Sequence, residues 1–272
     1  MQFYRRTGTW ANTAEIVFHS ASSKEEGDPA PFRASETSIL VLDGTLPRRI
    51  GESLKLISLN VARPRLTIYK GETINTGIFK HPVEGPVFLR ALNLDGDRQA
   101  DLSVHGGPNK AVYAYPSEHY PFWRRELRDM ELPWGMFGEN FTTEGLTEKG
   151  LHVGDRLQIG AAIVMVRQTR TPCYKLAVKF QRDDMLERFL ASGRSGVYFS
   201  VEKEGTVASG DSFQFLSRAA DGLTVEEMNH LIASDRYDRV LLEKAVATPA
   251  LPEGWREHFS DRLARIASVA SR

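Results

Sequence analysis

Cysteine is almost absent from the chain, because its 272 residues contain only Cys173. A single cysteine excludes an intramolecular disulfide, and it argues against structural zinc, which is usually held by two to four thiolates. The shortage of cysteine fits a reducing compartment, so we expect the protein to be cytoplasmic. Three roles remain open for Cys173: a catalytic thiol, a ligand to another metal, or an inert buried side chain.

The sequence also lacks an excess of charge and any long apolar run. Its 35 Lys and Arg residues balance its 35 Asp and Glu residues. Proteins that bind nucleic acid or anionic lipid usually carry a basic excess, so we expect no nucleic-acid partner and no membrane partner. No stretch approaches the roughly 18 apolar residues that a membrane-spanning helix needs. The content of 41% apolar and 26% charged residues is typical of a packed globular protein.

The chain divides into three parts by its residue pattern. Residues 1–53 include the polar, turn-rich stretch 20–31 and are predicted to be a disordered N-terminal extension. Residues 54–218 contain short apolar runs separated by glycine and proline, which favour a mostly antiparallel β-barrel in an α+β fold. The expected strands are 56–61, 66–69, 74–79, 87–92, 111–115, 156–159, 162–168, 196–202 and 212–216.

Helical spacing predicts two helices inserted in the β domain, at 116–128 and 183–190. Residues 219–272 are purely helical in pattern and predict a small three-helix unit. Its first helix, 224–232, opens with a capping-box pattern at Thr224 and Glu227. The second is expected at 238–246 and the third at 252–269, with a break near Ser260. A unit of this size rarely has a sufficient core alone, so it should pack on the β domain.

Two loops combine glycine with polar side chains that could bind a ligand. In the first, His105, Gly106 and Gly107 precede Lys110, so the backbone can approach an anion closely while the side chains supply donors. A tight loop with a solvated lysine is the alternative. In the second, Asn140 follows a glycine and a glutamate, just before a short strand. An Asx turn that satisfies its own backbone is the alternative there.

The third cluster surrounds the only cysteine. Pro172 stiffens the turn immediately before Cys173, and Arg170 and Lys175 flank it. Nearby cations stabilise the thiolate, which is the form that binds metal or attacks a substrate. A buried, unreactive cysteine remains the alternative to this functional interpretation.

Together these clusters resemble the MOSC domain, named after the C-terminal domain of molybdenum-cofactor sulfurases, and in particular its YiiM-like branch. The resemblance begins near Leu54 and runs to the end of the chain, where the predicted helices are similar to the three-helix appendage of that branch. The matching stretches occur in the order of the family: Val104-His-Gly-Gly-Pro-Asn-Lys-Ala-Val, Tyr115-Pro-Ser-Glu-His-Tyr, Gly138-Glu-Asn-Phe-Thr, Gly154-Asp and Arg170-Thr-Pro-Cys-Tyr-Lys-Leu.

The resemblance implies a β-barrel that binds the molybdenum cofactor (molybdopterin), with Cys173 as catalytic residue and protein ligand to the metal. A soft thiolate suits such a sulfur-rich centre. It further implies reduction of small N-hydroxylated compounds, such as hydroxylaminopurines or amidoximes, in detoxification. The residues expected to bind the cofactor are those of the three clusters with suitable donors: His105, Gly106, Gly107, Lys110, Asn140, Thr142, Arg170 and Lys175.

A separate redox protein is expected to supply the electrons, because the sequence has no flavin or nicotinamide motif. Its one cysteine also rules out an internal four-thiolate iron–sulfur cluster. Two other functions share the same residues. The protein could carry the cofactor, or sulfur on Cys173, without catalysis. It could also be a metal-free hydrolase that uses Cys173 with His105, if the thiol and the imidazole lie within hydrogen-bond reach.

Overall fold

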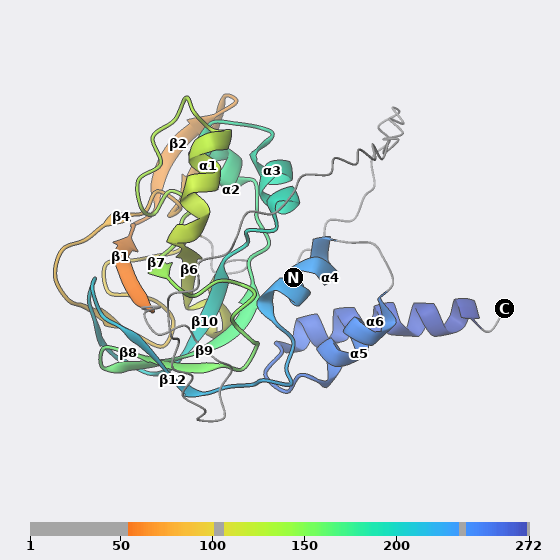
Figure 1. Cartoon of the computed structure of the whole chain (residues 1–272). Helices are drawn as coiled ribbons and strands as arrows, with labels where there is room; N and C mark the ends of the chain where they lie inside the picture. Colours follow the sequence, from red (N-terminus) through yellow and green to blue (C-terminus); the bar gives the residue numbers. More distant parts are fainter. Residues whose placement is uncertain (1–53, 101–105, 234–237, 271–272) are drawn as a thin grey trace, which may run out of the picture. The chain divides into compact units, whose positions relative to one another are not determined.

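A computed structural model describes residues 54–100, 106–233 and 238–270, and shows an α+β fold built on one large sheet (Figure 1). The predicted N-terminal extension lies outside the described residues. The order of the eight strands in the large sheet is β12-β8-β9-β10-β6-β7-β1-β4. These strands are β1 (Lys55–Val61), β4 (His81–Pro82), β6 (Val112–Pro116), β7 (Phe141–Glu144), β8 (Arg156–Ile159), β9 (Ala162–Thr169), β10 (Val197–Lys203) and β12 (Phe213–Ser217).

The large sheet is antiparallel except between β6 and β7, which are parallel. Its two sides are joined where β1 begins, because Leu56 N–H donates to the Asp211 carbonyl (2.9 Å) and Phe213 N–H donates to the Leu54 carbonyl (2.8 Å). The corresponding bridge pairs Lys55 with Ser212. The structure therefore shows a large, mostly antiparallel sheet in which the starts of β1 and β12 are linked through this bridge, while the closed barrel expected from the sequence stays a prediction.

Two small sheets flank the large one. One is the hairpin of β2 (Arg65–Tyr69) and β3 (Glu72–Thr76). In the other, β5 (Val87–Leu89) pairs with β11 (Gly205–Val207). The predicted strand 74–79 ends earlier than expected, at Thr76. The ladder stops there because Thr76 pairs with Arg65, the first residue of β2. At the next residue, Gly77, a Cβ would lie 2.4 Å from the Arg98 carbonyl oxygen. Only glycine allows this close backbone approach.

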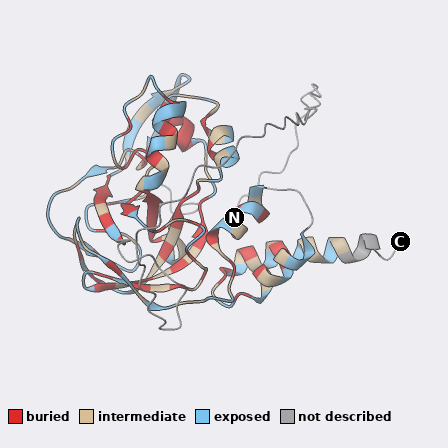
Figure 2. Ribbon diagram, in the orientation of Figure 1, coloured by how far each residue is buried: buried red, intermediate tan, exposed pale blue. Residues whose placement is uncertain are grey.

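The alternation of buried and half-buried residues along the strands explains the position of the main apolar core. In β9 the residues Ala162, Val164 and Val166 are buried, whereas the residues between them are half-buried. A strand with this period presents one face to the core, so the apolar cluster lies against one side of the sheet. Buried residues follow the strands and the inner faces of the helices in Figure 2.

An aromatic cluster forms a second core where three helices cover Tyr113 and Tyr115 of β6. These helices are α1 (Tyr120–Glu126), α2 (Lys175–Phe180) and α3 (Met185–Ser192), and a short 3-10 turn η2 (Ser117–His119) precedes α1. Trp123 of α1 is fully buried and donates through Nε1 to the Tyr115 hydroxyl (2.6 Å). The sequence predicted α1 and α3 but not α2, which begins two residues after Cys173.

The three-helix unit consists of α4 (Val225–Ala233), α5 (Arg239–Ala247) and α6 (Glu253–Ala270). The capping box is confirmed, since Glu227 N–H donates to Thr224 Oγ1 (3.0 Å) and Thr224 N–H to Glu227 Oε2 (2.8 Å). The expected break near Ser260 was wrong, because α6 continues through it. Val153 of the β domain belongs to the apolar cluster of this unit. The domain boundary at 218/219 stays a prediction.

Candidate functional site

A cavity of about 110 Å³ lies where the loop after β3, the 3-10 turn η1 (Pro108–Lys110) with Gly106 before it, and the loop after β9 meet. Most of its lining residues carry polar side chains. The lining side chains and backbone come from Thr76, Gly77, Ile78, Lys80, Arg98, Gln99, Ala100, Gly106, Lys110, Tyr113, Gly138, Asn140, Arg170, Thr171, Cys173, Lys175 and Tyr198. All three sequence clusters therefore contribute to one cavity.

Cys173 is half-buried and lines this cavity. It lies on the turn between β9 and α2, where Pro172 removes a backbone donor and fixes the backbone angle φ. The Cys173 carbonyl accepts a hydrogen bond from Leu176 N–H (2.9 Å), which begins the turn into α2. The thiol is thus accessible from the cavity rather than sealed in the apolar core.

The charge of the cavity has one sign. Its described lining contains five cations, namely Lys80, Arg98, Lys110, Arg170 and Lys175, and no carboxylate. Burial lowers the pKa of Lys110, and a negative charge on Cys173 opposes this effect, so the two groups are close enough to interact. Such a set of donors favours an anionic ligand.

Arg170 is fixed behind the thiol by two contacts. It is 6% exposed, its guanidinium lies 4.5 Å from the centre of the Tyr113 ring, and it donates to the Phe137 carbonyl. Burial alone would lower the pKa of Arg170, but the hydroxyl groups of Tyr113 and Tyr198 outweigh burial, so the pKa is raised. The side chain therefore stays cationic at the wall of the cavity.

The second sequence cluster divides between the cavity and the core. Asn140 lines the cavity and donates through Nδ2 to Asp97 Oδ2 (3.0 Å), while its Oδ1 accepts from Tyr113 N–H (3.3 Å). Thr142 is fully buried and does not belong to the described lining. Its hydroxyl donates to Glu139 Oε1 (3.0 Å), so its placement supports the loop rather than a ligand.

The two glycines of the first cluster also differ in whether they line the cavity. Gly106 lines the cavity and Gly107 does not, although both have φ of 86°, in the region that favours glycine. Lys110 follows them at the cavity. His105 lies outside the described residues, so its expected place beside the cofactor and its pairing with Cys173 both stay predictions.

Sequence analysis missed several lining residues, chiefly Lys80, Arg98, Gln99 and Tyr198. Lys80 forms a buried ion pair with Asp97, and Tyr198 lies opposite Gln168 in the ladder between β9 and β10. None of these residues belongs to a recognisable motif. Their position at the site depends on strand pairing between segments that are far apart in sequence, which local spacing does not reveal.

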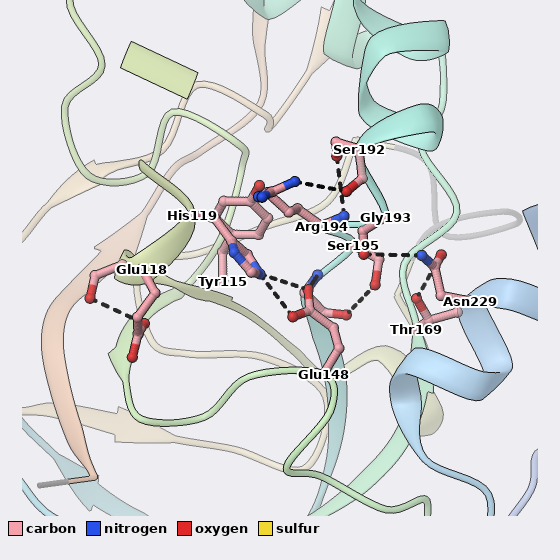
Figure 3. Close-up of polar contacts among 12 residues, drawn as sticks. Tyr115, Glu118, His119, Glu148, Thr169, Ser192, Gly193, Arg194, Ser195 and Asn229 are labelled. Carbon is pink, nitrogen blue, oxygen red and sulfur yellow. Dashed lines mark hydrogen bonds and ion pairs between the residues drawn. The ribbon is translucent and has the colours of Figure 1, made fainter. Parts of the chain in front are cut away.

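His119 forms a separate polar cluster (Figure 3). Its Nε2 lies 2.8 Å from Glu148 Oε2, and Glu148 Oε1 accepts from Gly196 N–H (2.6 Å). The residues of this cluster do not line the cavity. Within the described ranges, no group of three or more His, Cys, Asp or Glu side chains could hold a metal ion. No helix in these ranges is long and apolar enough to cross a membrane.

Comparison with known proteins assigns the β domain and the three-helix unit to known domain families. Residues 101–214 match the MOSC domain, and residues 223–265 match the YiiM-like 3-alpha helix domain. YflK of Bacillus subtilis is 40% identical over 218 residues, which are 80% of this chain and 98% of that protein. Protein YiiM of Escherichia coli is 34% identical over 189 residues, which are 69% of this chain and 84% of that protein.

Solved structures agree with these matches. The crystal structure of YiiM from Geobacillus stearothermophilus has a TM-score of 0.65 and 34% identity, and covers 77% of this chain and 99% of that one. The structure of YiiM from Escherichia coli has a TM-score of 0.59 and 29% identity, and covers 75% of this chain and 93% of that one. The chain belongs to the MOSC domain family, in the YiiM-like branch that carries a C-terminal three-helix domain.

Proposed function

We propose that this protein is a molybdenum-cofactor-dependent reductase of small N-hydroxylated compounds, of the hydroxylaminopurine or amidoxime type. The observation that carries the proposal is the single thiol, Cys173, half-buried at a cavity whose described lining has five cations and no carboxylate. A name gives further support: a protein of Gibberella moniliformis called "Reductase" is 32% identical over 186 residues, although these are only 32% of its length.

The residues present fit the cofactor. Cys173 would supply the soft thiolate that a sulfur-rich metal centre prefers. Lys110, Arg170 and Lys175 would bind the phosphate. Asn140 donates through Nδ2 to Asp97 and to the Asn60 carbonyl, so it would hold the cavity wall in place rather than donate to the pterin. When bound, the cofactor supplies the two-electron chemistry at the metal.

The overall reaction converts R–NHOH, two electrons and two protons into R–NH2 and water, so the N–O bond breaks and nitrogen is reduced. The chain would orient the substrate and keep solvent from it. The buried Tyr113 and the half-buried Tyr198 form walls of the cavity, and the rigid Arg170 would fix the position of the anion that it binds. We propose a separate redox protein as the electron donor, because the sequence has no flavin motif and too few cysteines for an iron–sulfur cluster.

Cys173→Ser tests the proposal directly. The variant and the wild type are produced in a host that makes the cofactor, and their molybdenum content is measured after gel filtration. A neutral hydroxyl replaces thiolate poorly, so we expect the variant to keep its fold but lose its molybdenum. Equal molybdenum content in the two proteins would refute the ligand assignment.

The same wild-type preparation separates a reductase from a cofactor carrier. It is supplied with reduced methyl viologen and either 6-hydroxylaminopurine or benzamidoxime, and formation of the amine product is measured. We expect turnover in the wild type and none in Cys173→Ser. Bound molybdenum without turnover of either compound would favour the carrier function instead.

A further inference from the structure

The three-helix unit contacts the end of the strand that leads to Cys173. Trp255 of α6 donates through Nε1 to Gln168 Oε1 (3.1 Å), and Thr169 Oγ1 donates to Asn229 Oδ1 of α4 (3.4 Å). Gln168 and Thr169 are buried and are the last two residues of β9, immediately before Arg170. Side chains from two helices therefore hold the segment at the point where it enters the site.

Asn229 also contacts the turn between α3 and β10 (Figure 3). Its Nδ2 donates to the Gly193 carbonyl (3.1 Å), in the turn between α3 and β10. Two residues later, the Ser195 carbonyl accepts from the Tyr113 hydroxyl (2.8 Å). One contact of Asn229 therefore holds Thr169, the residue before Arg170. The other holds the turn whose Ser195 carbonyl bonds to Tyr113, and the Tyr113 ring packs on the Arg170 guanidinium.

Cys173 has few restraints of its own. Thr171 is exposed, Pro172 has no N–H, and in the described part of the chain the Cys173 carbonyl accepts one backbone hydrogen bond, from Leu176. The thiol position then depends on where the two ends of the segment 170–174 are anchored. One anchor is α2, and the other is the end of β9.

We propose that Asn229 and Trp255 are positioning residues, through which the three-helix unit fixes the segment 168–173 and so the place of Arg170 and the Cys173 thiol at the cavity. The catalytic meaning of this arrangement rests on the function proposed above. The arrangement itself is a property of the chain alone. It gives the helical unit a role at a site to which it contributes no described lining residue.

The single cysteine allows a specific test, because any thiol reagent reports on Cys173 only. The full-length chain is produced without cofactor, and the rate of alkylation by iodoacetamide is measured under native conditions. Trp255→Phe and Asn229→Leu each remove hydrogen bonds and place an apolar side chain of roughly similar shape at the same position. We expect each to accelerate alkylation about five-fold, a factor equivalent to one hydrogen bond, because the half-buried thiol becomes more accessible.

Phe259→Leu is the matched control. Phe259 is fully buried and stacks on Trp255 at 5.6 Å, so the variant weakens the same core while the three hydrogen bonds of Trp255 and Asn229 remain. We expect its alkylation rate to equal that of the wild type. An unchanged rate in folded Trp255→Phe and Asn229→Leu would overturn the proposal, as would equal acceleration in Phe259→Leu, which would indicate general destabilisation.

A double mutant checks that the hydrogen bond itself is responsible. Gln168→Met removes the acceptor, and its combination with Trp255→Phe should be no faster than either single variant, because the two changes remove one interaction. Additive acceleration would contradict the proposed contact. Alkylation requires neither cofactor nor substrate, so failure here is distinguishable from failure of the reductase proposal.

Discussion

Lys110 illustrates how a single residue can be placed from sequence and then given an environment by structure. The glycine pair and the family motif predicted it at the ligand site, and it does line the cavity. Only the structure shows that burial lowers its pKa and that Cys173 is near enough to oppose the shift. Desolvation depends on residues far away in sequence, so local spacing cannot predict it.

We therefore expect Lys110→Ala to weaken retention of the cofactor without unfolding the protein. A hydrogen bond from a charged group is worth about 1.5–3 kcal/mol, so the loss should be about ten-fold or more. Molybdenum retained after dialysis is the measurement, with thermal unfolding as the check on the fold. Lys203→Ala, at an exposed lysine of β10, should retain molybdenum like the wild type. If Lys110→Ala does so too, Lys110 does not bind the cofactor.

Asn140 and Thr142 show the limit of prediction at this scale. Both belong to one motif, both carry hydrogen-bonding groups, and both were expected at the cofactor. The structure separates them, because Asn140 precedes β7 and lines the cavity whereas Thr142 lies within the strand and bonds to Glu139. Membership of a motif predicts proximity to a site but not the direction of each side chain.

Among the elements, those with strong periodicity or caps were predicted best. The strand 156–159 has the predicted bounds, and α4 begins at its predicted capping box. The helix α2 was missed because it is only six residues long and follows the proline turn at Cys173. A short helix gains little from its own propensity and depends on packing, here of Leu176 and Phe180 in the aromatic cluster.

The cap of α4 gives a prediction about pH. Partial burial opposes ionisation of Glu227, but hydrogen bonds from Lys244 and Thr224 outweigh it and lower its pKa below 4.5. A lowered pKa means that the folded state stabilises the carboxylate. This contribution is full above the pKa of an unfolded glutamate and is lost as pH falls through the folded value.

Glu227→Gln should therefore lower the free energy of unfolding by up to about 1 kcal/mol at neutral pH, because glutamine can keep the cap but not the partly exposed ion pair with Lys244. The difference from wild type should be smaller at about pH 3 than at neutral pH, because protonation of Glu227 removes the contribution of its carboxylate. Urea unfolding at the two pH values measures this. Glu226→Gln changes an exposed neighbour in the same helical turn and should have little effect at either pH. A difference that is equal at both pH values would contradict the proposed role of the carboxylate.

For the whole molecule, sequence predicted the α+β class and the order of parts, but not how the strands pair. Spacing and turn signals favoured antiparallel neighbours, whereas β6 and β7 are parallel, joined by a connection that contains α1. This pairing brings Tyr113 and Asn140 together, since Asn140 N–H donates to the Tyr113 carbonyl (2.8 Å). Pairing between strands that are far apart in sequence depends on the path of the whole chain, which no local sequence pattern predicts.

The helical unit and the β domain should unfold as one cooperative unit, because they share both core and hydrogen bonds. Val153 packs in the helical cluster, its N–H donates to the Leu223 carbonyl (2.8 Å), and Val225 N–H donates to the Leu151 carbonyl (2.9 Å). A cluster of this size, cut off from the β domain, would retain too little buried surface for independent stability.

Hydrogen exchange in increasing denaturant, followed peptide by peptide, measures this cooperativity. Peptides from β9 and from α5 should converge on the same free energy of opening, which equals the free energy of global unfolding. Trp255→Phe should lower both values together, since its contact with Gln168 lies between the two parts. A lower free energy confined to peptides of α4, α5 and α6 would instead show an independent folding unit. The boundary at 218/219 would then divide two domains that unfold separately.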